Sequence, residues 1–408
     1  MQWSRVGAGL GAAALCVGFV PGAAVAEGPP DYRPASGAKP IKGRESSIDG
    51  PLIEPAAVYT DTIGPGEKKY YRVQLDDSSD AFVSTVVAPP SGTATDFTDG
   101  VRVSLASADG GTKCSTDLSL AFGDETARPL AGYASRRIER GRSCQEAGEY
   151  FYTVERVGSA SGAWPVELTY MAEPGLKSGG DDQREPTDWS SKAPASPSST
   201  SARKARGGTG FNDAEPVDEG VWRDDIEPGE SRFYRVPVAW GKQLFLRAQL
   251  ANSGAGSTFF SVYGLRLELY NTARGQVAGN ATGYTGEPTG VELGTAPAAY
   301  ANRSTGKTDA VGAMRFQGWY YVQVTLSPEV PAAVPLTLKV DLRGTARPGP
   351  PYDGDAAAAG FGLDDPSEAA GTDSTMRVVG IAGIGAGAVL VLVMAAWYYV
   401  GRRRSTAV

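Results

Sequence analysis

Hydrophobic and polar residues alternate along short segments of this 408-residue chain. Between Tyr70 and Leu75, every second side chain from Tyr71 onward is hydrophobic, and Arg72 and Gln74 lie between them. This period of two predicts a β-strand with one buried face. The stretch "IGPGEKKYYRV" that contains it returns 163 residues later as "IEPGESRFYRV". Proline and glycine supply a turn before each strand, so both stretches open the same structural unit.

Four further alternating segments recur in the same order in both halves. They pair "AFVSTVV" (81–87) with "LFLRAQL" (244–250), "GVRVSL" (100–105) with "GLRLEL" (264–269), "GEYFYTV" (148–154) with "GWYYVQV" (318–324), and "PVELTY" (165–170) with "PLTLKV" (335–340). Neither half contains a convincing amphipathic helix. Short strands separated by turn-rich loops predict an all-β chain with two β-sandwich domains, at residues 52–172 and 217–343.

The first residues of the chain have the pattern of an export signal. One arginine precedes an apolar run that ends at a proline and glycine, and Ala24 and Ala26 give the small-x-small motif of a cleavage site. Residues 1–26 are therefore expected to be a signal peptide, with Glu27 as the first residue of the mature chain.

Residues 378–400 form a run of 23 residues without a charge. At 1.5 Å per residue, a helix of this length spans roughly 34 Å, enough to cross a bilayer. The arginines at 402–404 are expected to keep the tail, residues 401–408, in the cytoplasm. The prediction is a single-pass protein of the cell membrane with its bulk outside. Gly380, Gly383 and Gly387 would allow this helix to associate closely with another, although glycine is common in such spans.

Charge and composition exclude several classes of function. The net charge of −7 includes five arginines at positions 5, 377 and 402–404, so residues 27–376 carry −12. This charge disfavours nucleic-acid binding. The chain has no histidine, which excludes histidine-dependent triads and histidine-ligated zinc. Removal of the signal leaves only Cys114 and Cys144, for which we predict a disulfide in an oxidising compartment.

The order of these motifs resembles the bacterial pre-peptidase C-terminal domains. The likeness rests on "PGE" before an aromatic-Tyr-Arg-Val strand, on "VRVSL" followed by Asp-Gly, and on "AGEYFYTV" before a closing strand. The resemblance implies two jelly-roll-like, non-catalytic sandwiches that bind polymers or partner proteins. No protease domain accompanies them here. The heavy use of alanine, glycine and arginine suggests an actinobacterial type of source.

Three segments between these units are rich in small and polar residues. Residues 27–51 are expected to be disordered, residues 173–216 to be a disordered linker, and residues 344–377 to be a disordered stalk that leads to the membrane. Their shortage of branched apolar side chains is the reason for this expectation.

Two surface groups are candidates for binding. Asp76, Asp77 and Asp80 could supply oxygen ligands to calcium, or could form an ordinary solvated loop. A second group consists of aromatic residues at outward strand positions. These residues could stack on sugar rings or on a partner, or could form cross-strand pairs or a contact between the two sandwiches: Tyr70, Phe151, Phe233 and Tyr321.

The favoured function is a non-enzymatic accessory subunit of a cell-surface or export complex, which binds another membrane or exported protein. The alternative is attachment to cell-wall glycan or another polymer. A carboxylate-dependent hydrolase, with residues such as Glu67 and Glu230 as acid and base, is the third hypothesis. No cofactor and no catalytic residue is expected.

Overall fold

A computed structural model describes residues 28–115, 118–124, 126–177, 185–192, 201–254, 259–304 and 308–363. In these residues the chain forms twenty strands in four five-stranded sheets and two short helical segments, η1 (Tyr300–Ser304) and α1 (Asp309–Ala313). The all-β prediction is confirmed. The expected signal peptide, the membrane span with Gly380, Gly383 and Gly387, and the tail lie outside the described residues. No helix within the described ranges is long and apolar enough to cross a bilayer.

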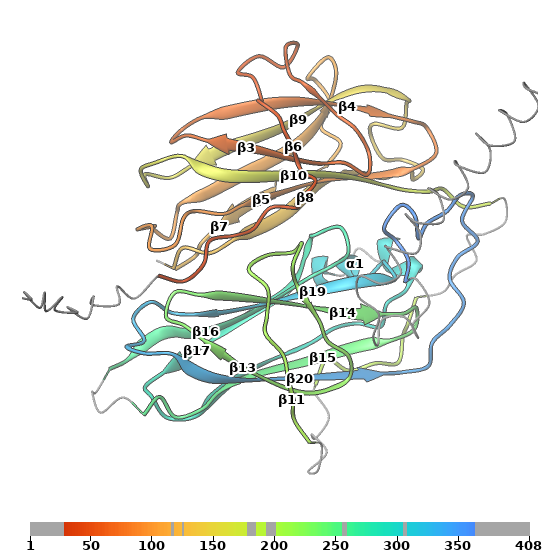
Figure 1. The fold of residues 1–408 in the computed structure, drawn as a ribbon. Coiled ribbons are helices and arrows are strands. Elements are labelled where there is room, and N and C mark those ends of the chain that lie inside the picture. The colour runs from red at the N-terminus through yellow and green to blue at the C-terminus, as the bar shows by residue number, and fades with distance from the viewer. Residues whose placement is uncertain are drawn as a thin grey trace, which may run out of the picture.

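The first sandwich consists of two sheets that face each other across one core (Figure 1). The first inner sheet has the order β1 (Lys39–Pro40), β3 (Val58–Ile63), β10 (Trp164–Glu173), β5 (Asp80–Val87) and β8 (Leu130–Arg136). The first outer sheet has the order β2 (Leu52–Ile53), β4 (Lys68–Leu75), β9 (Gly148–Val157), β6 (Gly100–Ser107) and β7 (Leu118–Ala121).

The second sandwich repeats this topology strand for strand. The second inner sheet has the order β12 (Glu215–Pro216), β14 (Ser231–Val238), β19 (Gly318–Leu326), β16 (Ser261–Tyr270) and β17 (Gln276–Tyr284). The second outer sheet has the order β11 (Arg203–Lys204), β13 (Gly220–Ile226), β20 (Val334–Arg343), β15 (Gln243–Leu250) and β18 (Thr289–Gly294). The five paired segments of the sequence repeat therefore occupy equivalent strands.

Burial follows the predicted alternation. In β4 the side chains of Tyr71, Val73 and Leu75 are buried in the first core, and in β14 the side chains of Tyr234 and Val236 are buried in the second. Each strand contributes the same face along its length, as a half-buried strand requires. The hydrophobic pattern therefore fixes which side of each predicted strand faces its own core.

An ordered strap crosses from one sheet to the other in each sandwich. Residues 39–53 place β1 beside β3 and β2 beside β4, and residues 203–216 place β11 beside β13 and β12 beside β14. Residues 39–51 and 203–216 were expected to be disordered, and that prediction is wrong. Their backbone groups pair with edge strands, which needs no branched apolar side chain.

Glycine brings each strap close to a buried tyrosine. The N–H of Gly43 donates to Asp61 (2.8 Å), which also accepts from the hydroxyl of Tyr71 (2.8 Å). In the second sandwich, Gly207 and the Tyr234 hydroxyl make the same two bonds to Asp224 (2.7 and 2.8 Å). A Cβ at Gly43 would lie 2.7 Å from the Tyr71 ring, so the crossing requires glycine.

The two sandwiches stack with their inner sheets against each other, giving four layers of sheet (Figure 1). One apolar cluster joins Val86 and Ala131 of the first sandwich to Phe233 and Tyr270 of the second. Ion pairs also cross the contact: Asp80–Arg315, Glu173–Arg315, Arg128–Glu268, Glu167–Arg274 and Asp124–Arg266. The two sandwiches therefore pack against each other as one unit and are not independent domains joined by a linker.

The two copies differ at this contact. The first inner sheet turns Phe82, Val86 and Tyr133 outward toward the second sandwich. The sheet with the same topology in the second sandwich is its outer sheet, and there Arg247 and Glu292 form an ion pair exposed to solvent. Of these two equivalent sheets, the first inner sheet is covered on its outward face and is apolar there. The second outer sheet faces solvent and carries charged side chains, because a solvated face favours charge.

The C-terminal segment, residues 344–363, packs along the contact between the sandwiches (Figure 1). Phe361 is buried between Phe82 and Phe316, with ring centroids 5.8 and 5.0 Å away, and the Tyr352 hydroxyl donates to Glu173 (2.7 Å). The expectation of a disordered stalk is therefore wrong for residues 344–363. Two aromatic side chains anchor an otherwise small and polar segment.

Candidate functional site

Equivalent strands of the two sandwiches run in a similar direction, so their equivalent loops lie at the same end of the molecule. We call one end the tip. It comprises the loops β3–β4, β5–β6, β7–β8 and β9–β10 and their counterparts β13–β14, β15–β16, β17–β18 and β19–β20. Asp124 in the β7–β8 loop pairs with Arg266 in the middle of β16, so a tip loop of the first sandwich lies against the second inner sheet. The other end, where β10 and β20 finish, is called the base.

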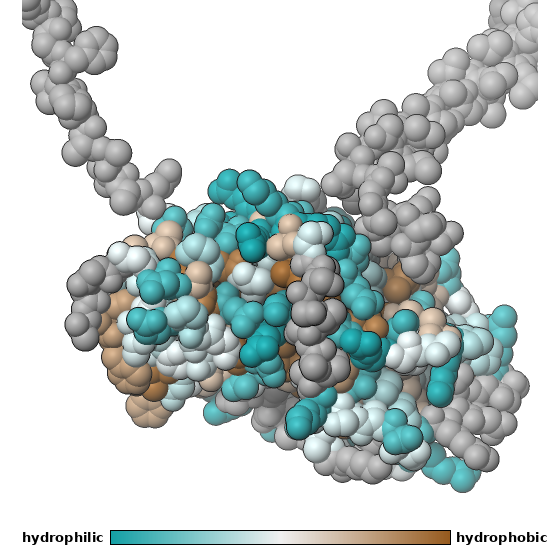
Figure 2. Space-filling view, turned by 90° about the horizontal axis from the view of Figure 1, so that it is seen from below, coloured by the Kyte–Doolittle hydropathy of each residue, from teal (hydrophilic) through white to brown (hydrophobic). Residues whose placement is uncertain are grey.

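Large hydrophobic side chains are exposed at the tip. Phe97 in the β5–β6 loop is 61% exposed and Phe260 in the β15–β16 loop is 66% exposed. Val262 and Tyr263, at the start of β16, are 58% and 47% exposed. Hydrophobic surface gathers at one end of the second sandwich in the space-filling view (Figure 2). We call these four residues the tip patch.

A bulge explains why two successive strand residues face solvent. The register of β16 against β17 shifts between Ser261 and Leu265, which interrupts the alternation of the strand. Val262 and Tyr263 are therefore both exposed, whereas the residues from Leu265 onward resume their alternation into the core. The bulge therefore turns both Val262 and Tyr263 toward solvent instead of placing one of them in the core.

Contacts across the sandwiches link the two halves of the patch. The carbonyl of Phe97 accepts from the N–H of Gly123 (3.3 Å), and the next residue, Asp124, pairs with Arg266. The guanidinium of Arg266 lies 5.6 Å from the centroid of the Tyr263 ring. A short chain of direct contacts thus connects Phe97 with Tyr263.

Asp99 fixes the loop that carries Phe97. Its carboxylate accepts from the N–H groups of Asp96 (2.6 Å), Ser159 (2.6 Å) and Ala160 (2.9 Å), which joins the β5–β6 loop to the β9–β10 loop. Burial opposes the charged form, but these donors outweigh it and hold the pKa of Asp99 below its usual value. A Cβ at Gly158, where φ is +99°, would lie 1.9 Å from the Asp99 carboxylate. The first half of the patch therefore rests on a defined loop.

Two of the four predicted binding aromatics lie at the contact between the sandwiches. Phe233 is fully buried, and Tyr321 packs against the same cluster, with their rings 5.1 and 5.2 Å from that of Phe211. They form the contact between sandwiches that was the alternative interpretation. Tyr70 and Phe151 are half-buried on adjacent strands of the first outer sheet, and Lys68 lies 5.4 Å from the Tyr70 ring.

The acidic loop of the first sandwich has internal partners instead of converging on a cation. Asp76 accepts from the N–H groups of Ser78 (2.9 Å) and Ser79 (2.6 Å), and Asp80 pairs with Arg315 at 2.6 Å. Asp77 is exposed. Within the described ranges, no three or more acidic or cysteine side chains form a group that could hold a metal. This arrangement does not fit the calcium hypothesis.

Glu67 and Glu230 perform the same task in the two sandwiches. Each accepts the backbone N–H three residues earlier, that of Gly64 (2.7 Å) or Glu227 (2.9 Å), and so closes its Pro-Gly turn. Because the two carboxylates stabilise equivalent turns in different sandwiches, the hydrolase hypothesis loses the pair on which it rested.

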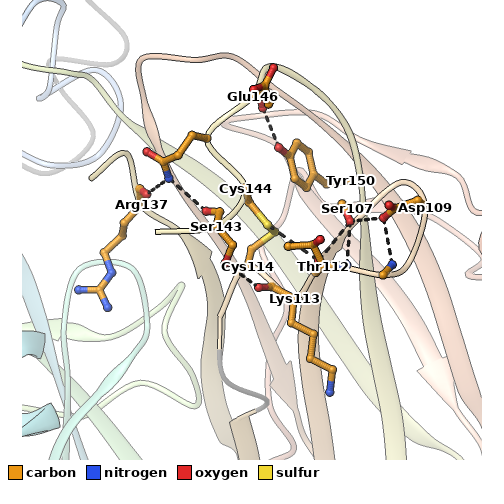
Figure 3. The surroundings of a disulfide bond; sticks show 12 residues. Ser107, Asp109, Thr112, Lys113, Cys114, Arg137, Ser143, Cys144, Glu146 and Tyr150 are labelled. Carbon is orange, nitrogen blue, oxygen red and sulfur yellow. Dashed lines mark hydrogen bonds between the residues drawn. A yellow bond between two sulfur atoms is a disulfide. The ribbon is translucent and has the colours of Figure 1, made fainter. Parts of the chain in front are cut away.

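The predicted disulfide between Cys114 and Cys144 is present and lies at the base (Figure 3). It joins the β6–β7 loop to the β8–β9 loop. Nearby, the Ser143 hydroxyl donates to the carbonyl of Lys113 (3.0 Å), and the Tyr150 hydroxyl donates to that of Glu146 (2.7 Å). This group holds two base loops together.

A pocket of about 410 Å³ also lies at the base, where both sandwiches meet the residues that follow β10. Its lining includes Asp80, Lys177, Tyr300, Arg303 and Asp353. Asp80 is engaged by Arg315, and the Arg303 guanidinium stacks 3.8 Å from the Tyr300 ring. Much of its polar lining thus serves the junction itself, so the tip patch is the stronger candidate site.

The tip patch was missed in the sequence. Phe260, Val262 and Tyr263 stand in "TFFSVYG", an apolar cluster that follows a glycine-rich loop and does not alternate. That break in alternation, directly before the strand "GLRLEL", was the available signal for exposed hydrophobic residues.

No protein family matches this chain. No curated protein matches it either. Solved structures with low similarity include the pre-peptidase C-terminal domain of a collagenase from Bacillus anthracis, with 12% identity, 34% of this chain and 98% of that chain covered, and a TM-score of 0.19. A tandem CBM22 domain from Paenibacillus barcinonensis has 10% identity, covers 79% and 100%, and has a TM-score of 0.21. Tandem CBM51 modules from Streptococcus pneumoniae have 10% identity, 70% and 83% coverage, and a TM-score of 0.21. Likenesses at this level carry no argument about function.

Proposed function

We propose that this chain is a non-enzymatic, membrane-anchored extracellular protein that binds another membrane or exported protein through its tip, as an accessory subunit of a cell-surface or export complex. The observation that carries the proposal is the tip patch. Both sandwiches contribute exposed hydrophobic side chains to the tip, two from loops and two from the start of β16, and clustered exposed apolar side chains typically mark an interaction surface.

The path of the C-terminal segment supports an orientation in which the base faces the membrane. Residues 344–363 pack at the base and along the contact between sandwiches, and the proposed membrane helix begins 15 residues after Leu363. A chain that leaves the ectodomain from the base would keep the base toward the membrane. The tip would then face outward, where a partner could reach it.

Binding of wall glycan is the competing function, and two of the four aromatic residues on which it rested, Phe233 and Tyr321, pack in the cluster between the sandwiches. The test uses the tagged full-length protein in cells of its source. Chemical crosslinking is followed by affinity recovery and mass spectrometry. The tip variant F97S/F260S/Y263S is compared with I48S, which alters a side chain that is 76% exposed on the first strap.

The proposal expects one membrane or exported protein in near-equal amount with the wild type and with I48S, and its loss with the tip variant. Equal recovery with all three forms would refute a role for the tip. Recovery of wall glycan fragments alone would replace the proposal with the glycan alternative.

A further inference from the structure

The loops at the tip are rich in negative charge. Eight carboxylates lie in the described residues of the tip loops: Glu67, Asp96, Asp99, Asp124, Glu227, Glu230, Glu287 and Glu329. Arg128 is the only basic residue in the same described stretches, and it is buried between Asp124 (2.7 Å) and Glu268 (3.2 Å). The tip therefore presents carboxylates without an exposed cation in its loops.

Four of these carboxylates are exposed to solvent, namely Asp96, Glu227, Glu287 and Glu329. The basic side chains on the neighbouring first outer sheet are already neutralised in part, because Lys68 and Arg102 both approach Glu155, at 3.7 and 3.8 Å. The negative potential of the exposed carboxylates is therefore directed at the solvent in front of the tip patch.

The base has the opposite balance of charge. Its described loops carry six carboxylates and eight basic residues. The carboxylates are Asp76, Asp77, Asp109, Glu139, Glu146 and Asp309, and the basic residues are Lys113, Arg137, Arg140, Arg142, Lys242, Arg274, Arg303 and Arg315. Among the described loops that join strands, the excess of carboxylates therefore lies at the end that carries the exposed apolar residues.

We infer that the surface that docks on the tip patch belongs to a protein whose contact region is cationic, with lysine or arginine around an apolar centre. This inference rests on the proposed function and names the chemistry of its partner. An apolar centre with a charged rim is the arrangement of a specific protein interface, in which the rim steers the encounter and the centre provides affinity.

The same charges disfavour the other occupants of the patch. A second copy of this chain would bring two acidic tips together, and like charges repel at an interface. Anionic lipid headgroups and phosphate-bearing polymers would be repelled for the same reason. A neutral glycan carries no charge for the exposed carboxylates to attract, whereas a cationic protein surface does.

The test places a photo-crosslinking phenylalanine analogue at position 260 of the full-length protein in intact source cells. A control places it at position 48, an exposed hydrophobic position on the strap. The crosslinked peptides are identified by mass spectrometry, which reports the chemistry of the contact itself. Association with the identified protein is then measured for a second tip variant, E227K/E287K/E329K. Its control, the strap variant E45K/D49K/E54K, makes the same change of net charge at exposed positions on the strap or directly after it.

The inference expects a contact peptide rich in lysine or arginine from position 260 only. The tip variant should slow association by about tenfold or more at low salt, with a smaller effect at high salt, while the strap variant stays within about twofold. A protein crosslinked through a neutral or acidic segment, or a tip variant that behaves like the strap variant, would overturn the inference and leave the proposed function standing. Crosslinks to a second copy, to lipid or to wall glycan, or none from position 260, would overturn both.

Discussion

One buried arginine, Arg315, makes two of the ion pairs that cross the contact between the sandwiches. The guanidinium of Arg315 lies 2.6 Å from the carboxylates of both Asp80 and Glu173, and it stacks on the rings of Phe82 and Phe316 at 5.2 and 5.1 Å. The exposed fractions of the three ionic side chains are 2%, 10% and 1%. Replacing Arg315 with methionine keeps much of the packing and removes a buried positive charge that is paired with both carboxylates.

The expected loss is large because the charges are buried. Removing one partner from a buried ion pair costs about 3–5 kcal/mol of the free energy of unfolding, since the remaining charge is desolvated without compensation. The matched control is R247M. Arg247 pairs with Glu292 at 2.9 Å, but their side chains are 41% and 44% exposed, and a pair of this kind contributes about 1 kcal/mol or less.

Chemical denaturation followed by far-UV circular dichroism and tryptophan fluorescence measures both losses. R315M should also make the unfolding transition less cooperative, because two of the ion pairs that couple the sandwiches are lost. Burial raises the pKa of Glu173, and loss of Arg315 raises it further, so the penalty in R315M should shrink as the pH falls and Glu173 binds a proton. Similar small losses of the free energy of unfolding in R315M and R247M would refute the role of Arg315 in the contact.

Three further predictions follow from local contacts. Replacing Cys114 and Cys144 with serine opens a loop with a sequence separation of 30 residues and should lower the free energy of unfolding by about 3–4 kcal/mol, measured by denaturation with and without reductant. Asp99→Asn should cost about 1–3 kcal/mol at pH 7, because one backbone donor then faces an amide. Since the folded pKa of Asp99 is depressed, its stabilisation is present above its unfolded pKa of about 3.9 and is lost as the pH falls through the folded value. The melting temperatures of wild type and variant should therefore approach each other as the pH is lowered below about 3.9. Phe361→Ala should release the C-terminal segment, so proteases should cut residues 344–363 first while both sandwiches survive; unchanged protection would contradict its role as an anchor.

The alternation of hydrophobic residues was sufficient to predict ten strands and their inward faces. It could be read because strands such as β4 and β14 contribute one face to a core and the other to a different environment. The disulfide was also predictable, because removal of the signal would leave one pair of cysteines.

The rest depended on contacts that local sequence does not encode. The strap of residues 39–53 contributes two-residue strands whose stabilisation comes from backbone pairing, which leaves no hydrophobic period. Phe233 occupies an outward position of its strand and is buried only because a second sandwich covers it. Buried arginines such as Arg315 look like surface residues in sequence until their carboxylate partners, far away in the chain, are known.

The contact between the sandwiches uses both ends of the described chain, which constrains the order of folding. The core of the first sandwich can form once Glu173 has been synthesised, but Tyr32 donates to Glu167 (3.1 Å) beside Asn212, and Phe361 closes the opposite side. Until residue 361 is available, the first sandwich presents Phe82 and its neighbours to solvent. A chain in which only the first sandwich has folded therefore exposes an apolar face. Aggregation competes most strongly with folding at this stage, before the second sandwich covers that face.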